Sequence, residues 1–238
     1  MLRLNKCIIQ NGDFKLKANF EIAPKSKVAI IGPSGSGKST LLEAIAGFQE
    51  FSSGEIAWCG SDLTQVHPGE RPFAMLFQDG NLFPHMTAKQ NIALGLQANR
   101  RLTTDEQQQV EAALSRVGLL NMGARRPAEL SGGQRSRVAL ARVLVQRRDL
   151  LLLDEPFAAL GPALKAEMLD LVAELVDETG TSFLMVTHDP NDARRITEEA
   201  ILVADGVAHK PCGTPQLIEN PPAALADYLV RRESFPEC

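Results

Sequence analysis

Short runs of hydrophobic residues recur along this chain and are separated by turns or by helical patterns. Three runs, Lys27–Ile31, Leu150–Leu153 and Ser182–Val186, are typical of buried strands. Leu164–Val176 lies between the last two and has the length and spacing of a connecting helix. Strands that alternate with helices favour an α/β fold with a mainly parallel sheet.

The first third of the chain is richer in strand patterns. Residues 14–31 contain alternating and apolar runs, and Leu41–Gly47 is a helical stretch that ends in glycine. Ser52–Glu55 predicts a turn, followed by strands at Ile56–Trp58 and Phe73–Phe77. We therefore expect several strands in this part of the chain.

The middle of the chain is predicted to be helical. Thr103 and Glu106 form a capping box, and Gly118 stands where a helix C-terminus favours glycine. Between them the hydrophobic residues fall on one helical face: Val110, Ala113, Leu114 and Val117. We expect a helical subdomain at approximately 85–135, inserted into one domain that spans 1–238.

Composition and charge narrow the classes of function. The 238 residues are 44% hydrophobic, which is too apolar for a disordered chain. The net charge of −4 lacks the basic surplus of a protein that binds nucleic acid through broad electrostatics. We therefore expect a globular protein with no nucleic-acid partner.

Targeting signals and cysteines indicate the compartment. The N-terminal residues show no secretory pattern, and the longest apolar run, near Leu150–Leu153, is far shorter than the roughly 20 residues that span a bilayer. The four cysteines, Cys7, Cys59, Cys212 and Cys238, are scattered without metal-ligand spacing. We expect reduced thiols in a cytosolic protein without its own membrane anchor.

A glycine-rich turn between a predicted strand and a predicted helix carries the sharpest local signal. It matches the full G-x-x-x-x-G-K-[ST] pattern, as Gly32-Pro33-Ser34-Gly35-Ser36-Gly37-Lys38-Ser39. Such a loop directs backbone N–H groups at phosphate oxygens, Lys38 adds a charge, and the Ser39 hydroxyl can ligate Mg²⁺. The alternative is a plain turn with a stray lysine, which the strand and helix on either side disfavour.

Two acidic residues follow the run of leucines at 150–153. Asp154 lies at the carboxyl end of the predicted strand, where α/β sheets bind ligands and a carboxylate can hold Mg²⁺. Glu155 could orient or deprotonate a water. On these residues alone, two acids capping a strand end in solvent is an equal alternative.

Two further features are ambiguous when taken alone. Ser131 and Gln134 form a capping box around Gly132 and Gly133, so a helix begins there with unobstructed N–H groups. On these residues alone, an ordinary helix cap is the better explanation. His188, at the end of the Ser182–Val186 strand, could reach a γ-phosphate or the attacking water, but a loop histidine taken alone is usually just solvated.

The order of these motifs resembles that of ABC transporter ATPases. The phosphate loop, Phe77-Gln78, Leu130-Ser131-Gly132-Gly133-Gln134, Leu151-Leu152-Leu153-Asp154-Glu155-Pro156 and Thr187-His188 follow one another along nearly the whole chain. The resemblance implies a P-loop NTPase core with a mainly parallel sheet, an N-terminal antiparallel β part and an inserted helical subdomain. It also implies ATP hydrolysis with ATP and Mg²⁺ bound.

The resemblance assigns roles to particular residues. It implies that Glu155 is the catalytic base, His188 the switch histidine and Gln78 the loop glutamine that touches Mg²⁺ and the attacking water. Ser39, Gln78 and Asp154 would hold the metal. The ATP phosphates would bind Gly32, Pro33, Ser34, Gly35, Ser36, Gly37, Lys38, Ser39 and Thr40, and the partner's ATP would bind Ser131, Gly132, Gly133 and Gln134.

The resemblance also implies partners and a location. Two copies would form a head-to-tail homodimer with two composite ATP sites. The dimer would drive an integral membrane permease and would work indirectly with a periplasmic or extracellular solute-binding protein. The chain would then lie at the cytoplasmic face of the inner membrane as a peripheral subunit. Phe83, Pro84 and His85 are the candidates for the exposed patch that meets the permease.

The chain departs from the family pattern at two positions. Gly161 stands where the family has an aspartate that helps the protomers communicate, so we expect looser coupling between the sites. Asn11 stands near the position of an aromatic that stacks on adenine, and Phe14 is the nearest aromatic that could replace it. Neither departure touches the phosphate or Mg²⁺ chemistry, and we expect an active ATPase.

Within the family, the chain most resembles ATPases of bacterial thiamine importers. The supporting stretches include Met75-Leu76-Phe77-Gln78, Gln90-Asn91-Ile92 and Val203-Ala204-Asp205-Gly206. ATPases of iron(III), molybdate or other small-solute importers share much of these stretches and remain alternatives. A soluble non-transport ABC ATPase is a further alternative, although this chain has one cassette and no heptad run.

Overall fold

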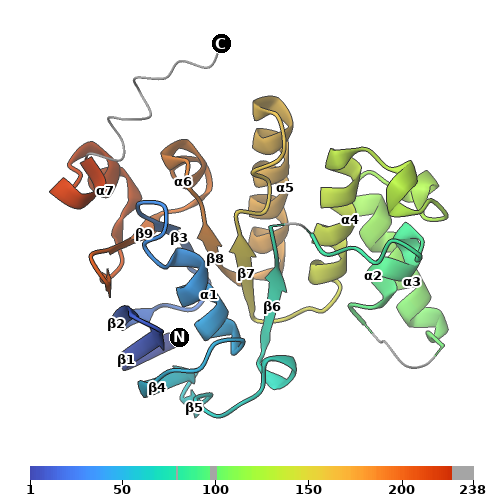
Figure 1. The fold of residues 1–238 in the computed structure, drawn as a ribbon. Coiled ribbons are helices and arrows are strands. Elements are labelled where there is room, and N and C mark those ends of the chain that lie inside the picture. Colours follow the sequence, from blue (N-terminus) through green and yellow to red (C-terminus); the bar gives the residue numbers. More distant parts are fainter. Residues whose placement is uncertain (79, 97–100, 227–238) are drawn as a thin grey trace.

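Eleven strands form one sheet in the part of the chain that the computed structural model describes, which is residues 1–78, 80–96 and 101–226. The strand order is β5-β4-β1-β2-β10-β9-β3-β8-β7-β6, and β11 pairs with β9. Figure 1 shows β1, β2, β4 and β5 gathered beside the N-terminus, whereas β6, β7 and β8 run side by side through the middle. The sheet therefore has an N-terminal β part and a parallel core.

Five adjacent strands form the parallel core: β9 (Glu199–Ala204), β3 (Lys27–Ile31), β8 (Ser182–Val186), β7 (Leu150–Asp154) and β6 (Phe73–Leu76). Their connections carry α1 (Lys38–Ala46), α5 (Pro162–Thr179) and α6 (Pro190–Ile196). The strands predicted at 27–31, 150–153 and 182–186 are confirmed, as is the helix between the last two, which is longer at both ends than predicted. Burial of the strands on both faces explains their continuous hydrophobic runs.

The N-terminal β part is antiparallel, as predicted. It consists of β1 (Leu2–Asn11), β2 (Phe14–Ile22), β4 (Ser53–Trp58) and β5 (Ser61–Asp62). The short strand β10 (Val207–Ala208) joins it to the core, because it pairs with both β2 and β9. The sheet is therefore continuous from one edge to the other.

The turn predicted at Ser52–Glu55 is wrong, because β4 already begins at Ser53. Gly54 has a φ of +91° and lies against a register shift in β1, where a Cβ would approach the Cys7 Cα to 2.5 Å. Glycine serves here for a close approach of two backbones in a strand, which a local pattern does not distinguish from a turn.

A helical part packs beside the core and contains α2 (Ala88–Ala93), α3 (Thr104–Arg116) and α4 (Gly132–Leu144). The capping boxes predicted at Thr103 and Ser131 are confirmed. One face of α4 packs on α2 and α3 and the opposite face packs on the core, so α4 runs across the predicted subdomain boundary near residue 135. The division at 85–135 stays a prediction.

Short elements complete the described fold. These are η1 (Pro68–Glu70), η2 (Leu120–Met122) and η3 (Pro127–Glu129), which are 3₁₀ turns, and β11 (Cys212–Gly213) and α7 (Thr214–Glu219) near the C-terminal end.

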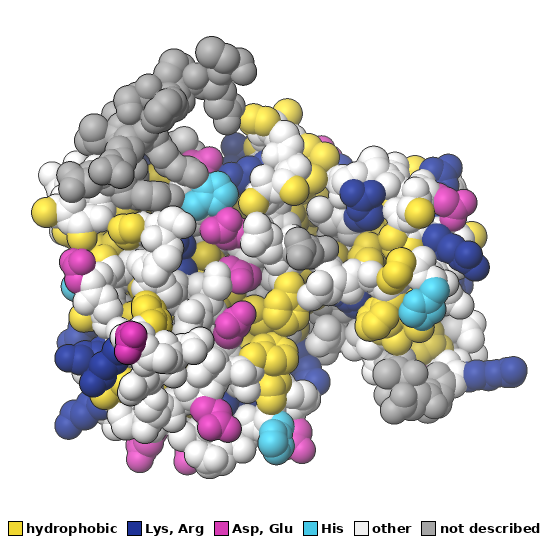
Figure 2. Space-filling model, in the orientation of Figure 1, with side chains coloured by type: hydrophobic (Ala, Val, Ile, Leu, Met, Phe, Trp, Pro, Cys, Tyr) yellow, Lys and Arg dark blue, Asp and Glu magenta, His cyan; other side chains and the backbone are white. Residues whose placement is uncertain are grey.

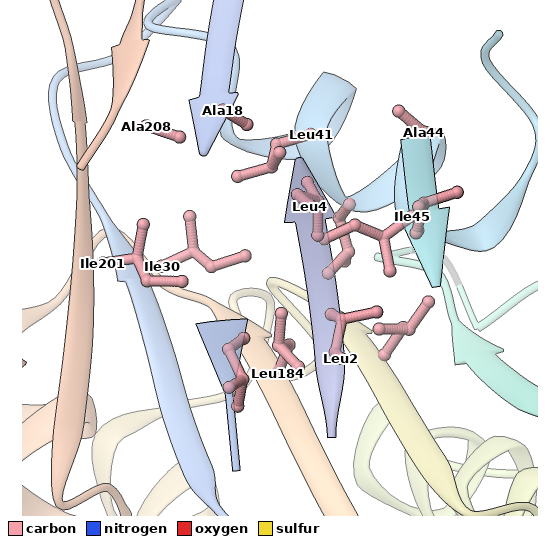
Figure 3. Packing of buried hydrophobic residues seen from close by; sticks show 14 of the residues in the cluster. Leu2, Leu4, Ala18, Ile30, Leu41, Ala44, Ile45, Leu184, Ile201 and Ala208 are labelled. Carbon is pink, nitrogen blue, oxygen red and sulfur yellow. The ribbon is translucent and has the colours of Figure 1, made fainter. Parts of the chain in front are cut away.

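Helix α1 packs against both the N-terminal β part and the parallel core of the sheet (Figure 3). Its Leu41 and Ile45 are fully buried in one cluster with Leu4 of β1 and with Ile30 and Leu184 of the parallel core. Each such side chain contributes about 1.5–3 kcal/mol on burial. This packing fixes the N-terminal end of α1 at the carboxyl end of β3, where the phosphate loop lies.

The cysteines within the described ranges, Cys7, Cys59 and Cys212, carry free thiols, and Cys238 lies outside those ranges. Burial raises the pKa of the Cys7 thiol to about 11. No helix within residues 1–78, 80–96 and 101–226 combines the length and apolar character needed to cross a membrane.

Candidate nucleotide-binding and hydrolysis site

The predicted site residues of the core follow four neighbouring strands at one edge of the sheet. The phosphate loop follows β3, Asp154 ends β7, His188 follows β8 and Gln78 follows β6. These strands are parallel, so their carboxyl ends meet along the same edge (Figure 1). That edge is where open α/β sheets bind ligands.

Two glycines let the phosphate loop turn tightly between β3 and α1. A Cβ on Gly32 would lie 2.1 Å from the Val203 carbonyl oxygen, so no side chain fits there. Gly37 caps α1 with a φ of +99°, and a Cβ would lie 2.4 Å from the ring carbon Cζ of Phe14. The loop therefore closes against both β9 and β2, with the helix N-terminus facing into it.

Lys38 is folded back over the loop. Its ammonium donates to the carbonyl oxygens of Gly32 at 3.0 Å and Pro33 at 2.9 Å, and only 7% of the residue is exposed. The Ser36 hydroxyl is also buried, and it has no hydrogen-bond partner among the described residues. A buried hydroxyl without a partner is rare and costly, so the loop has a polar group in place for a phosphate oxygen.

A hydrogen bond between Ser39 and Asp154 joins the first turn of α1 to the carboxyl end of β7. The Ser39 Oγ donates to Asp154 Oδ1 at 2.9 Å. Burial raises the pKa of the Asp154 carboxyl above its ordinary value and the Glu155 charge adds to this, whereas Ser39 and Lys38 oppose it. A hydroxyl and a carboxylate are ligand types that Mg²⁺ accepts, and its charge would offset the desolvation of Asp154. The donor set therefore fits Mg²⁺.

Glu155 and His188 form a hydrogen-bonded pair from adjacent strand ends. Glu155 Oε2 lies 2.8 Å from His188 Nδ1, and 23% and 33% of the two side chains are exposed. The Glu155 backbone has a φ of +42°, and its N–H donates to the Val186 carbonyl at 3.1 Å. A non-glycine residue in this left-handed region is held there by its surroundings, which here direct the carboxylate toward the histidine.

Gln78 and Thr40 lie at the margins of this edge. Gln78 is exposed in the loop after β6, and the neighbouring Phe77 ring packs against Phe48 at a centroid distance of 5.6 Å. Thr40 is half-buried in the first turn of α1. Figure 2 shows acidic side chains and histidines roughly in a line on one face of the molecule.

The Ser131 helix start is separate from these groups within one chain. Figure 1 shows α4 on the far side of β6 and α5 from α1. The Ser131 hydroxyl accepts from the Gln134 N–H at 3.3 Å, which leaves the Gly132 end exposed. A Cβ on Gly133 would lie 2.3 Å from Leu164 Cδ2, whereas one on Gly132 would meet only the Arg135 guanidinium, at 3.9 Å. This helix end therefore presents its backbone outward, away from the chain's own phosphate loop.

The two departures from the family pattern have clear positions. Asn11 is exposed and pairs with Phe14 across the β1–β2 turn, and the Phe14 ring packs against Gly37. Gly161 caps α5 at a φ of −63°, and a Cβ at this position would have no atom within 4 Å. An aspartate would therefore fit at 161 without strain.

Sequence reasoning missed three charged residues beside the Glu155–His188 pair. Lys165 of α5 forms ion pairs with Asp189 and Asp192, which lie around the start of α6. The only sequence hint is that Asp189 follows His188 directly. The contact joins residues far apart in the chain, so no local pattern predicts it.

The fold and the site define a P-loop nucleotide hydrolase: a phosphate loop heads a parallel strand, with carboxylates and a histidine at the neighbouring strand ends. The profile of the ABC transporter family matches residues 16–158. The chain belongs to this family, as an ATP-binding and ATP-hydrolysing subunit.

The relatives agree over almost the full length. The chain is 61% identical over 229 residues to the thiamine import ATP-binding protein ThiQ of Ruegeria sp. (strain TM1040), covering 96% of this chain and 99% of that protein. It is 54% identical to the protein of that name from Cereibacter sphaeroides, with the same coverage.

A solved structure has the same fold. A dimeric post-hydrolysis state of the ATP-binding cassette MJ0796, bound to ADP and Pi, superposes with a TM-score of 0.78 at 28% identity. The match covers 90% of this chain and 99% of that chain. The predicted α/β P-loop fold and the predicted family are confirmed.

Proposed function

We propose that this protein is the ATPase subunit of a thiamine importer. Its full-length similarity to proteins named for thiamine import carries this proposal, because the 61% and 54% identities span 96% of the chain. The cassette would lie at the cytoplasmic face of the membrane, held there by an integral permease. A solute-binding protein outside would deliver thiamine to that permease.

The phosphate loop would hold the triphosphate of ATP. Backbone N–H groups at the start of α1 would meet phosphate oxygens, and the unpartnered Ser36 hydroxyl would contribute a further hydrogen bond. Lys38 would move from the Gly32 and Pro33 carbonyls, 3.0 and 2.9 Å away, to the β- and γ-phosphates. Its buried position makes it a strong electrostatic partner once negative charge arrives.

Ser39 and Asp154 would hold Mg²⁺ with the phosphates, and Gln78 would complete the set from the next strand end. When bound, the metal would neutralise charge on the β- and γ-phosphate oxygens. The Ser39–Asp154 hydrogen bond of 2.9 Å already holds these two oxygens together.

Glu155 and His188 would carry the hydrolytic step. The Glu155 carboxylate would accept a proton from the water that attacks the γ-phosphorus, while the bond to the leaving ADP oxygen breaks. An ionised carboxylate only accepts hydrogen bonds, so at 2.8 Å the His188 Nδ1 carries the proton and donates. His188 would thereby hold Oε2 in place and leave Oε1 of Glu155 for the water.

The outward-facing start of α4 supports a head-to-tail homodimer. Ser131, Gly132 and Gly133 present a helix N-terminus that its own chain does not use for phosphate. Placed over the partner's phosphate loop, it would bind the γ-phosphate, so each ATP would lie between two protomers. The related cassette MJ0796 forms a dimer in its solved structures.

Exposed aromatic residues beside Gln78 form the proposed permease contact. Phe48 is 58% exposed and packs against Phe77, and Phe83 is 46% exposed and meets His85 edge-on. In Figure 2, hydrophobic side chains gather between the core and the helical part on this face. A hydrophobic segment of the permease would bury these rings and sense Gln78 movement.

Transport in membrane vesicles tests the proposed function. Vesicles would contain a candidate thiamine permease and its binding protein, together with wild-type chain or Glu155→Gln. We expect ATP-dependent uptake of labelled thiamine with the wild type only, unaffected by excess iron(III) or molybdate. Uptake of iron(III) or molybdate in place of thiamine would make this an importer of that solute. ATP hydrolysis by the chain without ATP-dependent uptake of any of these solutes would favour the non-transport alternative.

A further inference from the structure

Lys165 joins α5 to the turn that carries His188. Its Nζ lies 2.7 Å from Asp192 Oδ2 and 3.3 Å from Asp189 Oδ2. The Lys165 and Asp192 side chains are only 16% and 10% exposed. Water screens an ion pair at such a position far less than one on the surface, so the pair holds its geometry more strongly.

The two acceptors of Lys165 hold the residues on either side of His188. Asp189 follows His188 directly, and Asp192 is hydrogen-bonded to Thr187, which precedes His188. Asp192 Oδ2 also accepts from the Thr187 hydroxyl at 2.7 Å. The same hydroxyl accepts from the Asp189 N–H at 3.0 Å. Thr187, Asp189, Asp192 and Lys165 thus form one closed network around the histidine, in which every bond fixes the backbone or a side chain of the turn.

The backbone of Lys165 is hydrogen-bonded to the segment that follows Glu155. The Lys165 N–H donates to the Gly161 carbonyl at 2.9 Å, in the first turn of α5. Glu155, Lys165, Thr187, His188 and Asp192 line one small cavity. Lys165 therefore belongs to the helix that follows the Glu155 loop, and its ammonium contacts the His188 turn. It also lines the same cavity as the Glu155–His188 pair.

We propose that Lys165 is a positioning residue that sets the Glu155–His188 geometry for hydrolysis. This inference rests on the roles proposed above for those two residues. Without the ammonium, the neighbouring carboxylates of Asp189 and Asp192 lose their shared cation and repel each other, so the turn shifts. Displacing a catalytic group by about 1 Å can cost up to roughly 10²-fold in rate.

Steady-state ATP hydrolysis by the purified full chain tests the proposal. We expect Lys165→Met to lower kcat about tenfold while KM for ATP changes less than twofold, because the phosphate loop is untouched. Lys165→Arg keeps the charge and should restore kcat to within about threefold of wild type. Asp192→Asn should also lower kcat, and adding it to Lys165→Met should cost less than the product of the single effects.

A second ion pair between the same helices is the matched control. Arg195 of α6 binds Asp170 of α5 through two hydrogen bonds of 2.6 and 2.7 Å, on the exposed side. Asp170→Asn should leave kcat unchanged. An unchanged kcat in Lys165→Met would overturn the positioning role. A loss of kcat in Lys165→Arg or in Asp170→Asn as large as that in Lys165→Met would also overturn it. Failure of the roles proposed for Glu155 and His188 would look different, because Glu155→Gln would then release phosphate as fast as the wild type whatever Lys165→Met did.

Discussion

His188 Nδ1 and Glu155 Oε2 lie 2.8 Å apart, although 33 positions separate them in the chain. The contact exists because β7 and β8 are parallel neighbours, with Asp154 opposite Val186, so both residues emerge at one edge. The pair places an imidazole nitrogen against the proposed general base.

Replacing His188 tests this pair. His188→Ala should lower kcat by about 10²-fold, since general acid–base arrangements contribute roughly 10²–10⁴. ATP binding to the phosphate loop should change little. Phosphate release and nucleotide titration measure the two effects, with the exposed His209→Ala as control. A His188→Ala enzyme within twofold of wild-type kcat would remove the histidine from the mechanism.

The half-buried carboxylate of Asp154 is expected to lower the stability of the nucleotide-free protein, although the proposed Mg²⁺ site needs it. Burial raises its pKa, so the folded state holds the proton more tightly than the unfolded state. Its contribution to stability is therefore fully present below the unfolded pKa of about 4 and is lost as pH rises through the folded value. At pH 7 the ionised carboxylate destabilises the nucleotide-free protein.

Asp154→Asn should accordingly raise the melting temperature without nucleotide at pH 7 and abolish Mg²⁺-dependent hydrolysis. Thermal unfolding from pH 4 to pH 8 measures the first effect, and the gap between variant and wild type should widen as pH rises. A variant that melts below wild type across this range would contradict the assignment of burial as the dominant cause.

A substitution at Gly132 is expected to disrupt the ATP-dependent dimer without disrupting the fold. Gly132→Asp adds a side chain without a clash, because the nearest atom is Arg135 Nη2 at 3.9 Å from the added Cβ. A negative charge at a helix N-terminus stabilises the folded chain by about 0.3–1 kcal/mol. The same charge would repel the γ-phosphate of the partner's ATP. In a Glu155→Gln background we expect an unchanged or slightly raised melting temperature and loss of the ATP-dependent dimer.

The control for this prediction is Gly69→Asp, since Gly69 is exposed and a Cβ there would have no atom within 4 Å. This variant should dimerise normally. If Gly132→Asp dimerised equally well by light scattering, the start of α4 would have no place in the composite site.

Gly161 predicts weak communication between the two ATP sites. Its φ of −63° and the open space around it admit an aspartate, which is also a better helix N-cap than glycine by a few tenths of a kcal/mol. Gly161→Asp should therefore fold normally and raise the Hill coefficient for ATP. An unchanged coefficient would show that this position does not limit coupling.

The sequence predicted best what local chemistry dictates. The phosphate loop needs fixed spacing between its glycines, Lys38 and Ser39, and the Thr103 and Ser131 capping boxes each form within one helical turn. The buried strands were recognisable because strands covered on both faces are hydrophobic throughout.

Features that depend on distant contacts could not be predicted from the sequence. Gly54 looked like a turn residue, whereas a close approach to Cys7 explains it. The ion pairs of Lys165 with Asp189 and Asp192 bridge two helices, and no periodicity reports such a contact. The outward orientation of Gly132 likewise follows from the packing of α4 and not from its capping box.

The central claim is that two copies of this chain enclose ATP and that Glu155 then hydrolyses it. Light scattering of Glu155→Gln during size exclusion tests this most directly, with ATP and Mg²⁺ present or absent. Hydrolysis is blocked while the phosphate and metal groups remain, so we predict a stable dimer with ATP and a monomer without it. A monomer under both conditions would contradict the composite site.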